Sequence, residues 1–510
     1  MFKVLEQSDL KYKTFVEQGK LSELRKIIRK CIDQEADKIS TINQSLKPKI
    51  VQQIERQICL DRISHLLLNP KIVRQSIKTR NKIGLIYPLH ESWINTFVVH
   101  GVKVNRNVCK ALFQIYLMQK LTISYYKFIN NFFKKNSRKP PKLGNVIVQI
   151  SSNVNTSTFE FKDSLNFKNW LREKKLVSSD DILTFLSSNR QAMAENGLHT
   201  DDLFKSGKIE SIKRLFLMSH DNPKNTIRYF FRKPDLLFQY LNFDAGLFKN
   251  VEMIIVPSSE HWIKQIWHFK AEELGIKVVF VNLSDSVDAS MTFDNDSSIA
   301  WTPLSNWQSV VVCSENQAEA FLRHCNKIVP PEIKLLGVPD WTDFHDERLT
   351  NLNRFVAIFD NEPHKGYYGL SSNNDCGFFE IENALKFLDD IIQVSSKLNI
   401  NCVLKPKRKL SNKTRYTEYF DGLRHFTSEY TNFHFLDERV APKKIIRASL
   451  ASINLPFTST GLIARECGVP TCFYDPVGRI NISDPGSSGI KIINNIKSLQ
   501  IWLDEVIQLK

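Results

Sequence analysis

Three hydroxyl residues stand in a row where a short apolar run gives way to a helical pattern: Thr458, Ser459 and Thr460. The apolar run before them predicts a buried strand, and the periodicity after them predicts a helix that ends at Gly468. Hydroxyl groups and free backbone N–H groups at a helix N-terminus stabilise an anionic oxygen. The stretch therefore predicts a phosphate-binding turn, with an ordinary capped helix in a parallel sheet as the alternative.

A carboxylate follows in the same predicted helix. Glu466 lies about two turns beyond the hydroxyl residues. The field of a helix terminus falls off within its first turn, so Glu466 would not cancel the attraction for a phosphate. We expect it to face a hydroxyl group of a ribose or sugar.

A basic run forms the second chemical element. The strand predicted at 401–404 is followed directly by Lys405, and Lys407 and Arg408 come within the next four residues. In open α/β sheets ligands bind beyond the carboxyl ends of the strands. The planar guanidinium of Arg408 suits a phosphate group. The pattern predicts that these cations neutralise the phosphate of a nucleotide, with a solvated basic loop as the alternative.

The residues around the hydroxyl triplet also form a family signature. Residues 456–460, Pro-Phe-Thr-Ser-Thr, together with Gly468, Pro470 and Tyr474, closely resemble the signature of bacterial surface-polysaccharide biosynthesis proteins named for their PFTS motif. Proteins of that family resemble GT-B glycosyltransferases. The resemblance implies an α/β fold of two doubly wound Rossmann-type domains facing a cleft, a nucleotide-sugar donor, and no metal or other cofactor.

The catalytic base should come from the first of these domains. Displacement at an anomeric carbon needs a carboxylate or histidine within hydrogen-bond reach of the acceptor hydroxyl. Glu260 and His261 follow the strand predicted at 251–256 and are the first candidates. Weaker candidates are Asp285, Asp288 and His220. As an alternative, Glu260 is a helix-terminus acid and His261 a surface residue.

The elements that position these residues alternate along the chain, which implies parallel sheets. Strands are predicted at 146–150, 251–256, 277–281, 309–313, 333–336, 355–359, 401–404, 434–436 and 452–455. Helices are predicted at 167–174, 180–188, 209–218, 260–274, 315–324, 379–397 and 442–448. We therefore predict a helical basic region over 1–142, an acceptor domain over 143–345 and a nucleotide-sugar-binding domain over 346–510.

The positive charge is concentrated in the N-terminal region. Residues 1–142 contain 28 Lys and Arg against 10 Asp and Glu, whereas the remaining residues contain 42 against 44. No acidic residue occurs between Ser92 and Phe159. This asymmetry predicts an anionic partner for the N-terminal region.

A long apolar helix is predicted at about 108–135, with Asn107 as its cap. Its polar stripe comprises Lys120, Lys127, Asn131 and Lys134, at spacings of seven, four and three. Gln114, Gln119, Lys120 and Lys127 make the helix too polar to span a membrane. A helix lying in the membrane interface with snorkelling lysines fits better. The alternative is a helix packed on the protein's own first domain.

The composition indicates how many domains to expect and in which state the cysteines should be. A chain of 510 residues with 42% hydrophobic residues should form more than one domain with real cores. The nine cysteines show no zinc spacing, and no signal peptide is evident, so we expect a cytoplasmic protein with reduced thiols.

The family resemblance, taken with these observations, implies a glycosyltransferase at the inner face of the bacterial inner membrane. It would move a sugar, with a CMP-activated acidic sugar as one candidate, onto a lipid-linked surface polysaccharide or O-antigen (lipopolysaccharide) precursor. The alternatives are a teichoic-acid-type polyol-phosphate transferase, a nucleotide-sugar epimerase of the same fold and a nucleic-acid-binding protein. The last is disfavoured, because the aromatic residues of the basic region lie in a helical pattern rather than on a stacking sheet.

Overall fold

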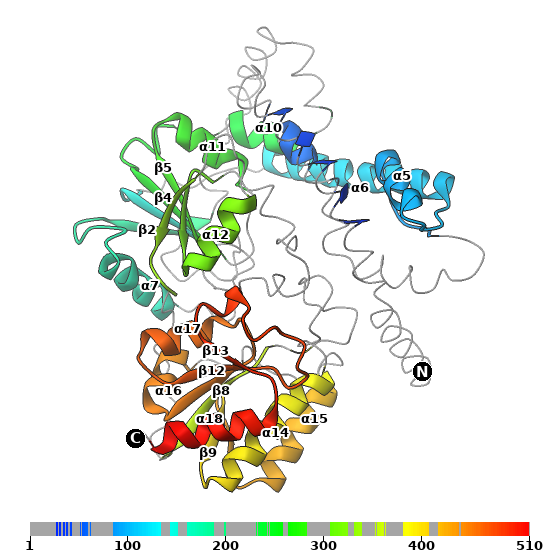
Figure 1. The fold of residues 1–510 in the computed structure, drawn as a ribbon. Coiled ribbons are helices and arrows are strands. Elements are labelled where there is room, and N and C mark those ends of the chain that lie inside the picture. Colours follow the sequence, from blue (N-terminus) through cyan, green and yellow to red (C-terminus); the bar gives the residue numbers. More distant parts are fainter. Residues whose placement is uncertain are drawn as a thin grey trace.

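The computed structural model describes two α/β domains and part of a helical N-terminal region (Figure 1). The described residues are 85–133, 143–150, 161–187, 198–199, most of 231–258, 264–282, 307–324, 331–338, most of 352–363, 381–406, 417–437 and 440–508, with scattered residues between 27 and 62. All of those scattered residues are helical, as predicted.

The first domain is built on a seven-stranded sheet with the order β3-β2-β1-β4-β5-β6-β7. Every neighbouring pair is parallel. The strands are β1 (Val146–Ile150), β2 (Leu183–Ser187), β3 (Leu198–His199), β4 (Met253–Ser258), β5 (Lys277–Asn282), β6 (Ser309–Val312) and β7 (Glu332–Leu335). The strand order reverses between β1 and β4, which is the mark of a doubly wound sheet.

The second domain is built on a six-stranded sheet with the order β10-β9-β8-β11-β12-β13. It is also entirely parallel. The strands are β8 (Phe355–Phe359), β9 (Asn401–Leu404), β10 (Phe433–Phe435), β11 (Ala451–Asn454), β12 (Thr471–Tyr474) and β13 (Lys491–Ile493). Here the order reverses between β8 and β11. Two doubly wound domains confirm the predicted α/β, GT-B-like fold class.

Helices connect the strands and cover the sheets. In the first domain they are α7 (Phe161–Glu173), α10 (Pro234–Leu241), α11 (Ile266–Glu273) and α12 (Glu315–His324). In the second they are α14 (Ile381–Lys397), α15 (Thr417–Glu429), α16 (Pro442–Ala448), α17 (Ser459–Glu466) and α18 (Ile496–Gln508), with a short 3-10 turn, η6, at Pro485–Ser487.

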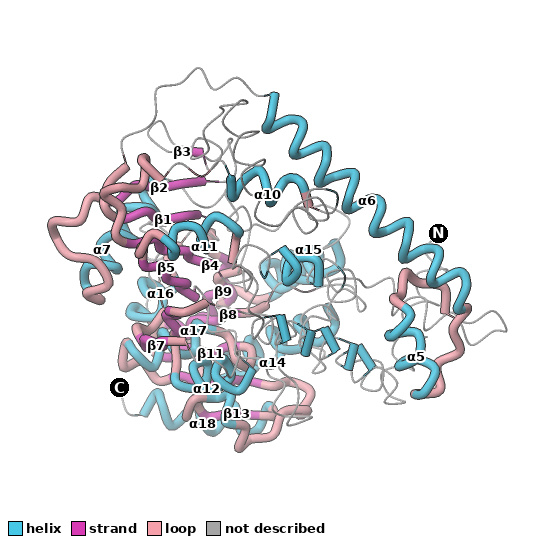
Figure 2. The backbone as a smooth tube through the Cα atoms, turned by 90° about the horizontal axis from the view of Figure 1, so that it is seen from above, coloured by secondary structure: helices cyan, strands magenta, loops and turns pink. Residues whose placement is uncertain are grey.

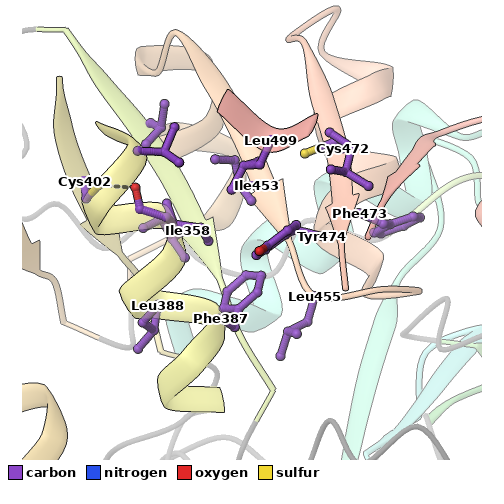
Figure 3. Packing of buried hydrophobic residues seen from close by; sticks show 14 of the residues in the cluster. Ile358, Phe387, Leu388, Cys402, Ile453, Leu455, Cys472, Phe473, Tyr474 and Leu499 are labelled. Atoms are coloured by element: carbon purple, nitrogen blue, oxygen red, sulfur yellow. Dashed lines mark hydrogen bonds between the residues drawn. The ribbon is translucent and has the colours of Figure 1, made fainter. Parts of the chain in front are cut away.

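The core of the second domain lies on both faces of its sheet. Successive side chains of β8 alternate between the two faces, as strand geometry requires. Val356 and Ile358 pack with residues of α14, α15 and α18, and Phe355, Ala357 and Phe359 pack with residues of α16 and α17. Figure 3 shows part of the first cluster, in which the Tyr474 ring lies 5.9 Å from that of Phe387.

Most predicted elements of the two sheets match the structure within a few residues, but one is wrong. The segment predicted as a helix at 180–188 contains strand β2, which pairs with β1 along its whole length. Asp181 does not start a helix, because its carboxylate accepts hydrogen bonds from Ser178 N at 2.6 Å and Asn145 Nδ2 at 2.7 Å, and so fixes a turn. The helix predicted at 209–218 lies outside the described residues.

The N-terminal region contributes two described helices, α5 (Glu91–Val99) and α6 (Arg106–Phe133). Asn105 rather than Asn107 caps α6, since its Oδ1 accepts from Val108 N at 3.4 Å and its carbonyl accepts from Cys109 N at 2.9 Å. Figure 2 shows α6 as a long helix beside α10 and at a distance from the sheets. Among the described helices, none combines the length and the apolar character needed to cross a membrane.

Candidate functional site

The carboxyl edge of the second sheet brings two of the predicted elements together. Lys405 N donates to Ile358 O at 3.1 Å, and Leu455 N donates to Phe359 O at 3.0 Å. The chain segments after β9 and β11 therefore leave the sheet on either side of β8. Since neighbouring strands lie about 4.8 Å apart, the two segments start about 10 Å from each other. This is the switch point at which doubly wound sheets bind ligands.

The hydroxyl triplet lies at this edge in the predicted strand, turn and helix. Phe457 has a φ of 62°, a left-handed conformation that reverses the chain before Thr458, the N-cap of α17. Its buried ring packs against Phe473, with 5.7 Å between ring centroids. The apolar contact therefore holds the turn whose next three residues carry the hydroxyl groups.

The three hydroxyl groups are not equivalent. Thr458 Oγ1 donates to Leu455 O at 2.9 Å, and Thr460 Oγ1 donates to Thr458 Oγ1 at 3.1 Å. Within the described part of the chain, the Ser459 hydroxyl makes no such bond. The Thr458 side chain does not cap the helix, and the first turn of α17 contains no acidic residue. Gly461 N already donates to Thr458 O at 3.1 Å, so the Ser459 hydroxyl and the N–H groups of Ser459 and Thr460 are the donors best suited to a ligand oxygen.

Close packing fixes the direction of α17. A Cβ atom on Gly461 would lie 2.6 Å from Cε1 of Phe473, so only glycine lets the helix approach β12 this closely. At its other end the helix stops at Gly468, whose φ is 68°, as the sequence predicted. The Arg465 guanidinium donates to Ser488 O in the loop that follows β12. The N-terminus of α17 is therefore held in place by its own domain.

A buried carboxylate lies at the end of β8, at a position where the sequence suggested either a border of the donor site or an ordinary loop. Asp360 is buried and accepts a hydrogen bond from the Tyr419 hydroxyl of α15. Burial, together with the Asp360 carboxylate, raises the pKa of Tyr419 well above its ordinary value of 10.0. Tyr419 therefore stays protonated and holds Asp360 in the middle of the switch point.

The basic run is described only at its start. Lys405 is half-buried directly after β9, whereas Lys407 and Arg408 lie outside the described residues. The structure thus places one of the three predicted cations beside the switch point.

Glu466 lies apart from the hydroxyl triplet. It is the last residue of α17, about 10 Å along the helix from Ser459 at a rise of about 1.5 Å per residue. A Cβ atom on Gly337, which follows β7 of the first domain, would lie 2.9 Å from Glu466 Oε1. Partial burial raises the pKa of Glu466, against the opposing effect of Lys174, Lys443 and Arg465. Glu466 therefore meets the first domain, and Figure 1 shows α17 on that side of the second domain.

The predicted catalytic residues cannot be placed. Glu260 and His261 lie outside the described residues, as do Asp285, Asp288 and His220. What the structure describes near the first switch point is a network that the sequence did not reveal. Gln149 of β1, 1% exposed, donates from Nε2 to Gln265 Oε1 at 3.0 Å, and its Oε1 lies 2.5 Å from His268 Nε2.

The hydrogen bonds of His268 define its tautomer. Its Nδ1 accepts from Gln265 N at 3.2 Å, so the ring proton is on Nε2 and is donated to Gln149. Burial, with nearby Lys264 as a smaller cause, places the pKa of His268 well below its ordinary value of 6.5. Both ring nitrogens are occupied by protein groups, so His268 is neutral and positions its neighbours rather than acting as a base.

No metal site is evident in the parts of the chain that the structure describes: no three His, Cys, Asp or Glu residues there are grouped so that they could hold an ion. The described cysteines are all free thiols. Burial raises the pKa of the Cys402 thiol to about 12, which suits a packing residue.

Comparison with known families assigns the chain. Residues 243–503 match the family model of polysaccharide biosynthesis PFTS motif proteins, and this match covers half of the chain. The two doubly wound domains and the hydroxyl-bearing turn at the second switch point fit the GT-B-like fold class that the sequence predicted. The chain belongs to the PFTS motif family of polysaccharide biosynthesis proteins.

Solved structures give likenesses at low identity. UDP-GlcNAc 2-epimerase from Methanocaldococcus jannaschii is 10% identical over 71% of this chain and 92% of its own, with a TM-score of 0.38. The glycosyltransferase SnogD from Streptomyces nogalater is 11% identical over 71% and 91%, with a TM-score of 0.35. Sucrose-phosphate synthase from Thermosynechococcus elongatus is 11% identical over 71% and 90%, with a TM-score of 0.36. None of these TM-scores reaches 0.5, so the likenesses favour no particular activity. Among curated proteins, none matches this sequence.

Proposed function

We propose that this protein is a nucleotide-sugar-dependent glycosyltransferase that extends a lipid-linked surface polysaccharide or O-antigen precursor at the inner face of the bacterial inner membrane. The first donor to test is a CMP-activated acidic sugar. Membership of a polysaccharide biosynthesis family supports the pathway, and the geometry of the second switch point supports binding of a nucleotide.

One observation carries the proposal. The hydroxyl-bearing turn after β11 and Lys405 after β9 flank the end of β8 on the same edge of one sheet. N–H groups, a hydroxyl group and a cation about 10 Å apart can contact the phosphate of one nucleotide from two sides. A phosphate leaves more readily when its developing charge is stabilised in this way.

Each predicted residue then has a role. Ser459 donates to a phosphate oxygen, Thr458 and Thr460 hold the turn around it, and Lys405, Lys407 and Arg408 neutralise the leaving phosphate. We assign Glu466 to the contact between the domains, where donor hydroxyls would lie if the donor sits between them. Glu260 and His261 remain the proposed bases for deprotonating the acceptor hydroxyl. Transfer should need no metal ion and should continue in the presence of a chelator.

A nucleotide panel tests the proposal. The thermal stability of the full chain would be measured with CMP, UDP, GDP, CDP and their sugars, since a ligand that binds only the folded protein raises the melting temperature. We expect CMP compounds to stabilise the wild type and to stabilise Ser459→Ala less. A matched control is Ser498→Ala, an exposed serine at the start of α18, which should respond like the wild type.

The outcomes separate the rival functions. Stabilisation by a UDP or GDP compound but not by a CMP compound would support the nucleotide site and show that the donor is not a CMP-sugar. No response to any nucleotide would refute the proposal. CMP release from CDP-glycerol without sugar transfer would identify a polyol-phosphate transferase. Turnover of a UDP-sugar without an acceptor would identify an epimerase.

A further inference from the structure

Helix α6 carries an exposed apolar ridge along most of its length. The ridge residues recur every three or four positions, and so lie on one face of the helix: Val108, Ala111, Ile115, Met118, Thr122, Tyr126 and Ile129. Ile115, Met118, Tyr126 and Ile129 are 55%, 60%, 66% and 47% exposed. Thr122 does not interrupt the ridge, because its hydroxyl donates to Met118 O at 2.9 Å. Ile123, 51% exposed, widens the ridge on one side.

The opposite face of α6 is already used for packing within the protein. The buried Phe113 ring lies 5.6 Å from the ring of Trp93 in α5. The buried Ser124 hydroxyl donates to the carboxylate of Asp235 in α10. The helix is therefore fixed to the first domain and to α5, and this fixed orientation presents the ridge outward.

The charged residues of α6 itself all have one sign. α6 contains four basic residues and no acidic residue, and the whole stretch from Ser92 to Phe159 lacks acids. Lys120 and Lys127 lie three residues before and four residues after Ile123, so they border the ridge on that side. Lys127 is exposed, and Lys120 Nζ lies 5.5 Å from the centre of the Tyr116 ring.

The geometry points to the α6 ridge as the surface that inserts into an anionic phospholipid leaflet, with the helix axis lying in the plane of the interface. Apolar side chains would enter the acyl boundary, while the bordering lysines reach the headgroups. A second copy of the chain fits the ridge less well. It would bring two regions with 28 basic against 10 acidic residues together, whereas an anionic leaflet neutralises that charge.

This inference rests on the proposed function, because it names the surface that would hold the enzyme beside a lipid-linked acceptor. It is independent of the nucleotide site, which belongs to the other domain. Vesicle binding and nucleotide binding can therefore succeed or fail separately.

The test is co-sedimentation of the full chain with vesicles of phosphatidylglycerol and phosphatidylethanolamine, compared with vesicles of phosphatidylcholine alone. The ridge variant is Ile115→Gln with Met118→Gln. The matched control is Ile482→Gln with Ile501→Gln, which changes two isoleucines of the second domain that are 63% and 61% exposed. A charge variant, Lys120→Gln with Lys127→Gln, tests the border of the ridge.

We expect the wild type and the control to bind the anionic vesicles and to leave the neutral ones unbound. The ridge variant should bind about tenfold less or weaker still, and the charge variant should lose several-fold and show less salt dependence. Undiminished binding by the ridge variant, or equal binding of the wild type to neutral vesicles, would overturn the inference. A wild-type dimer that the ridge variant dissociates would show instead that a second copy covers the ridge. Thermal shifts with nucleotides, measured on every variant, show whether the proposed donor site has failed as well.

Discussion

The carboxyl edges of the two sheets use their polar groups in opposite ways. At the first switch point, Gln149, Gln265 and His268 bond to one another, and both nitrogens of the buried histidine are occupied. At the second, the Ser459 hydroxyl and the first turn of α17 stay uncapped by side chains of the described residues, while Tyr419 holds Asp360. The comparison shows that equal topology does not give equal chemistry: among the described residues, the polar groups at the first edge bond to one another, whereas the Ser459 hydroxyl at the second has no such partner.

The largest effect on stability is expected when the hydrogen-bond network at the first switch point is disrupted. Gln149→Leu leaves the His268 Nε2–H without its acceptor and removes one donor to Gln265, so it should cost about 2 to 4 kcal/mol of unfolding free energy. Denaturant unfolding measures this. Gln500→Leu, on the exposed face of α18, is the control and should change stability by about 0.5 kcal/mol or less. A variant as stable as the wild type would show that the network does not support the domain.

Tyr419→Phe tests the hydrogen bond to Asp360 at the second switch point. It removes the hydroxyl that donates to buried Asp360 and should cost about 1 to 3 kcal/mol, together with part of the nucleotide-induced thermal shift. Tyr474→Phe is the comparison, because the Tyr474 hydroxyl donates to Asp390 at 2.7 Å and that carboxylate also pairs with Lys386. We expect the smaller loss for Tyr474→Phe. The reverse order would mean that Asp360 has other sufficient partners.

The buried His268 at the first edge should make the stability of the protein depend on pH. The pKa of folded His268 lies well below 6.5, so below pH 6.5 the unfolded chain binds a proton that the folded chain does not. Stability should therefore fall as the pH drops through this range, by up to about 1.4 kcal/mol per pH unit. Unfolding curves at several pH values measure the slope. His425→Gln changes an exposed histidine of α15 and should leave the slope intact, and a flat wild-type profile would contradict a neutral buried His268.

The smallest effects should come from the hydroxyl triplet, and they should separate binding from stability. Ser459→Ala should weaken nucleotide binding about three- to tenfold at unchanged stability, since one hydrogen bond contributes about 0.5 to 1.5 kcal/mol. Thr458→Val should lower stability by a similar free energy, because its hydroxyl bonds to the turn. Titration calorimetry and thermal unfolding of both variants measure the difference. Equal binding by Ser459→Ala and the wild type would remove Ser459 from the site.

The sequence predicted the sheets better than the segments between them. β8 is a short, fully apolar run between turn signals, and β9 is an apolar run that starts with Asn401; both begin and end where predicted. The segment 180–188 failed because its apolar residues fit a helical turn as well as a strand. Its pairing with β1 decided the outcome, since that contact joins residues 37 positions apart in sequence.

The candidate site likewise has a part that could be predicted from the sequence and a part that could not. The order strand, hydroxyl-bearing turn, helix could be predicted from residues 450–468, because apolar periodicity and Gly468 are local signals. The buried partners could not. Tyr419 and Asp360 are 59 residues apart, and Gln149 and His268 are 119 apart. In neither pair does the spacing along the sequence indicate that the two residues are in contact.

By itself, the sequence determined two parallel sheets, the hydroxyl-bearing turn near Ser459 and the basic character of the N-terminal region, because composition, periodicity and turn residues act over a few positions. Only the tertiary structure decided that, among the described residues, the Thr458 and Thr460 hydroxyls are bonded within the turn and that of Ser459 is not, that Glu466 meets the first domain, and which face of α6 remains exposed. Those outcomes depend on which distant segments pack together, and burial and hydrogen bonding between such segments leave no local signal in the chain.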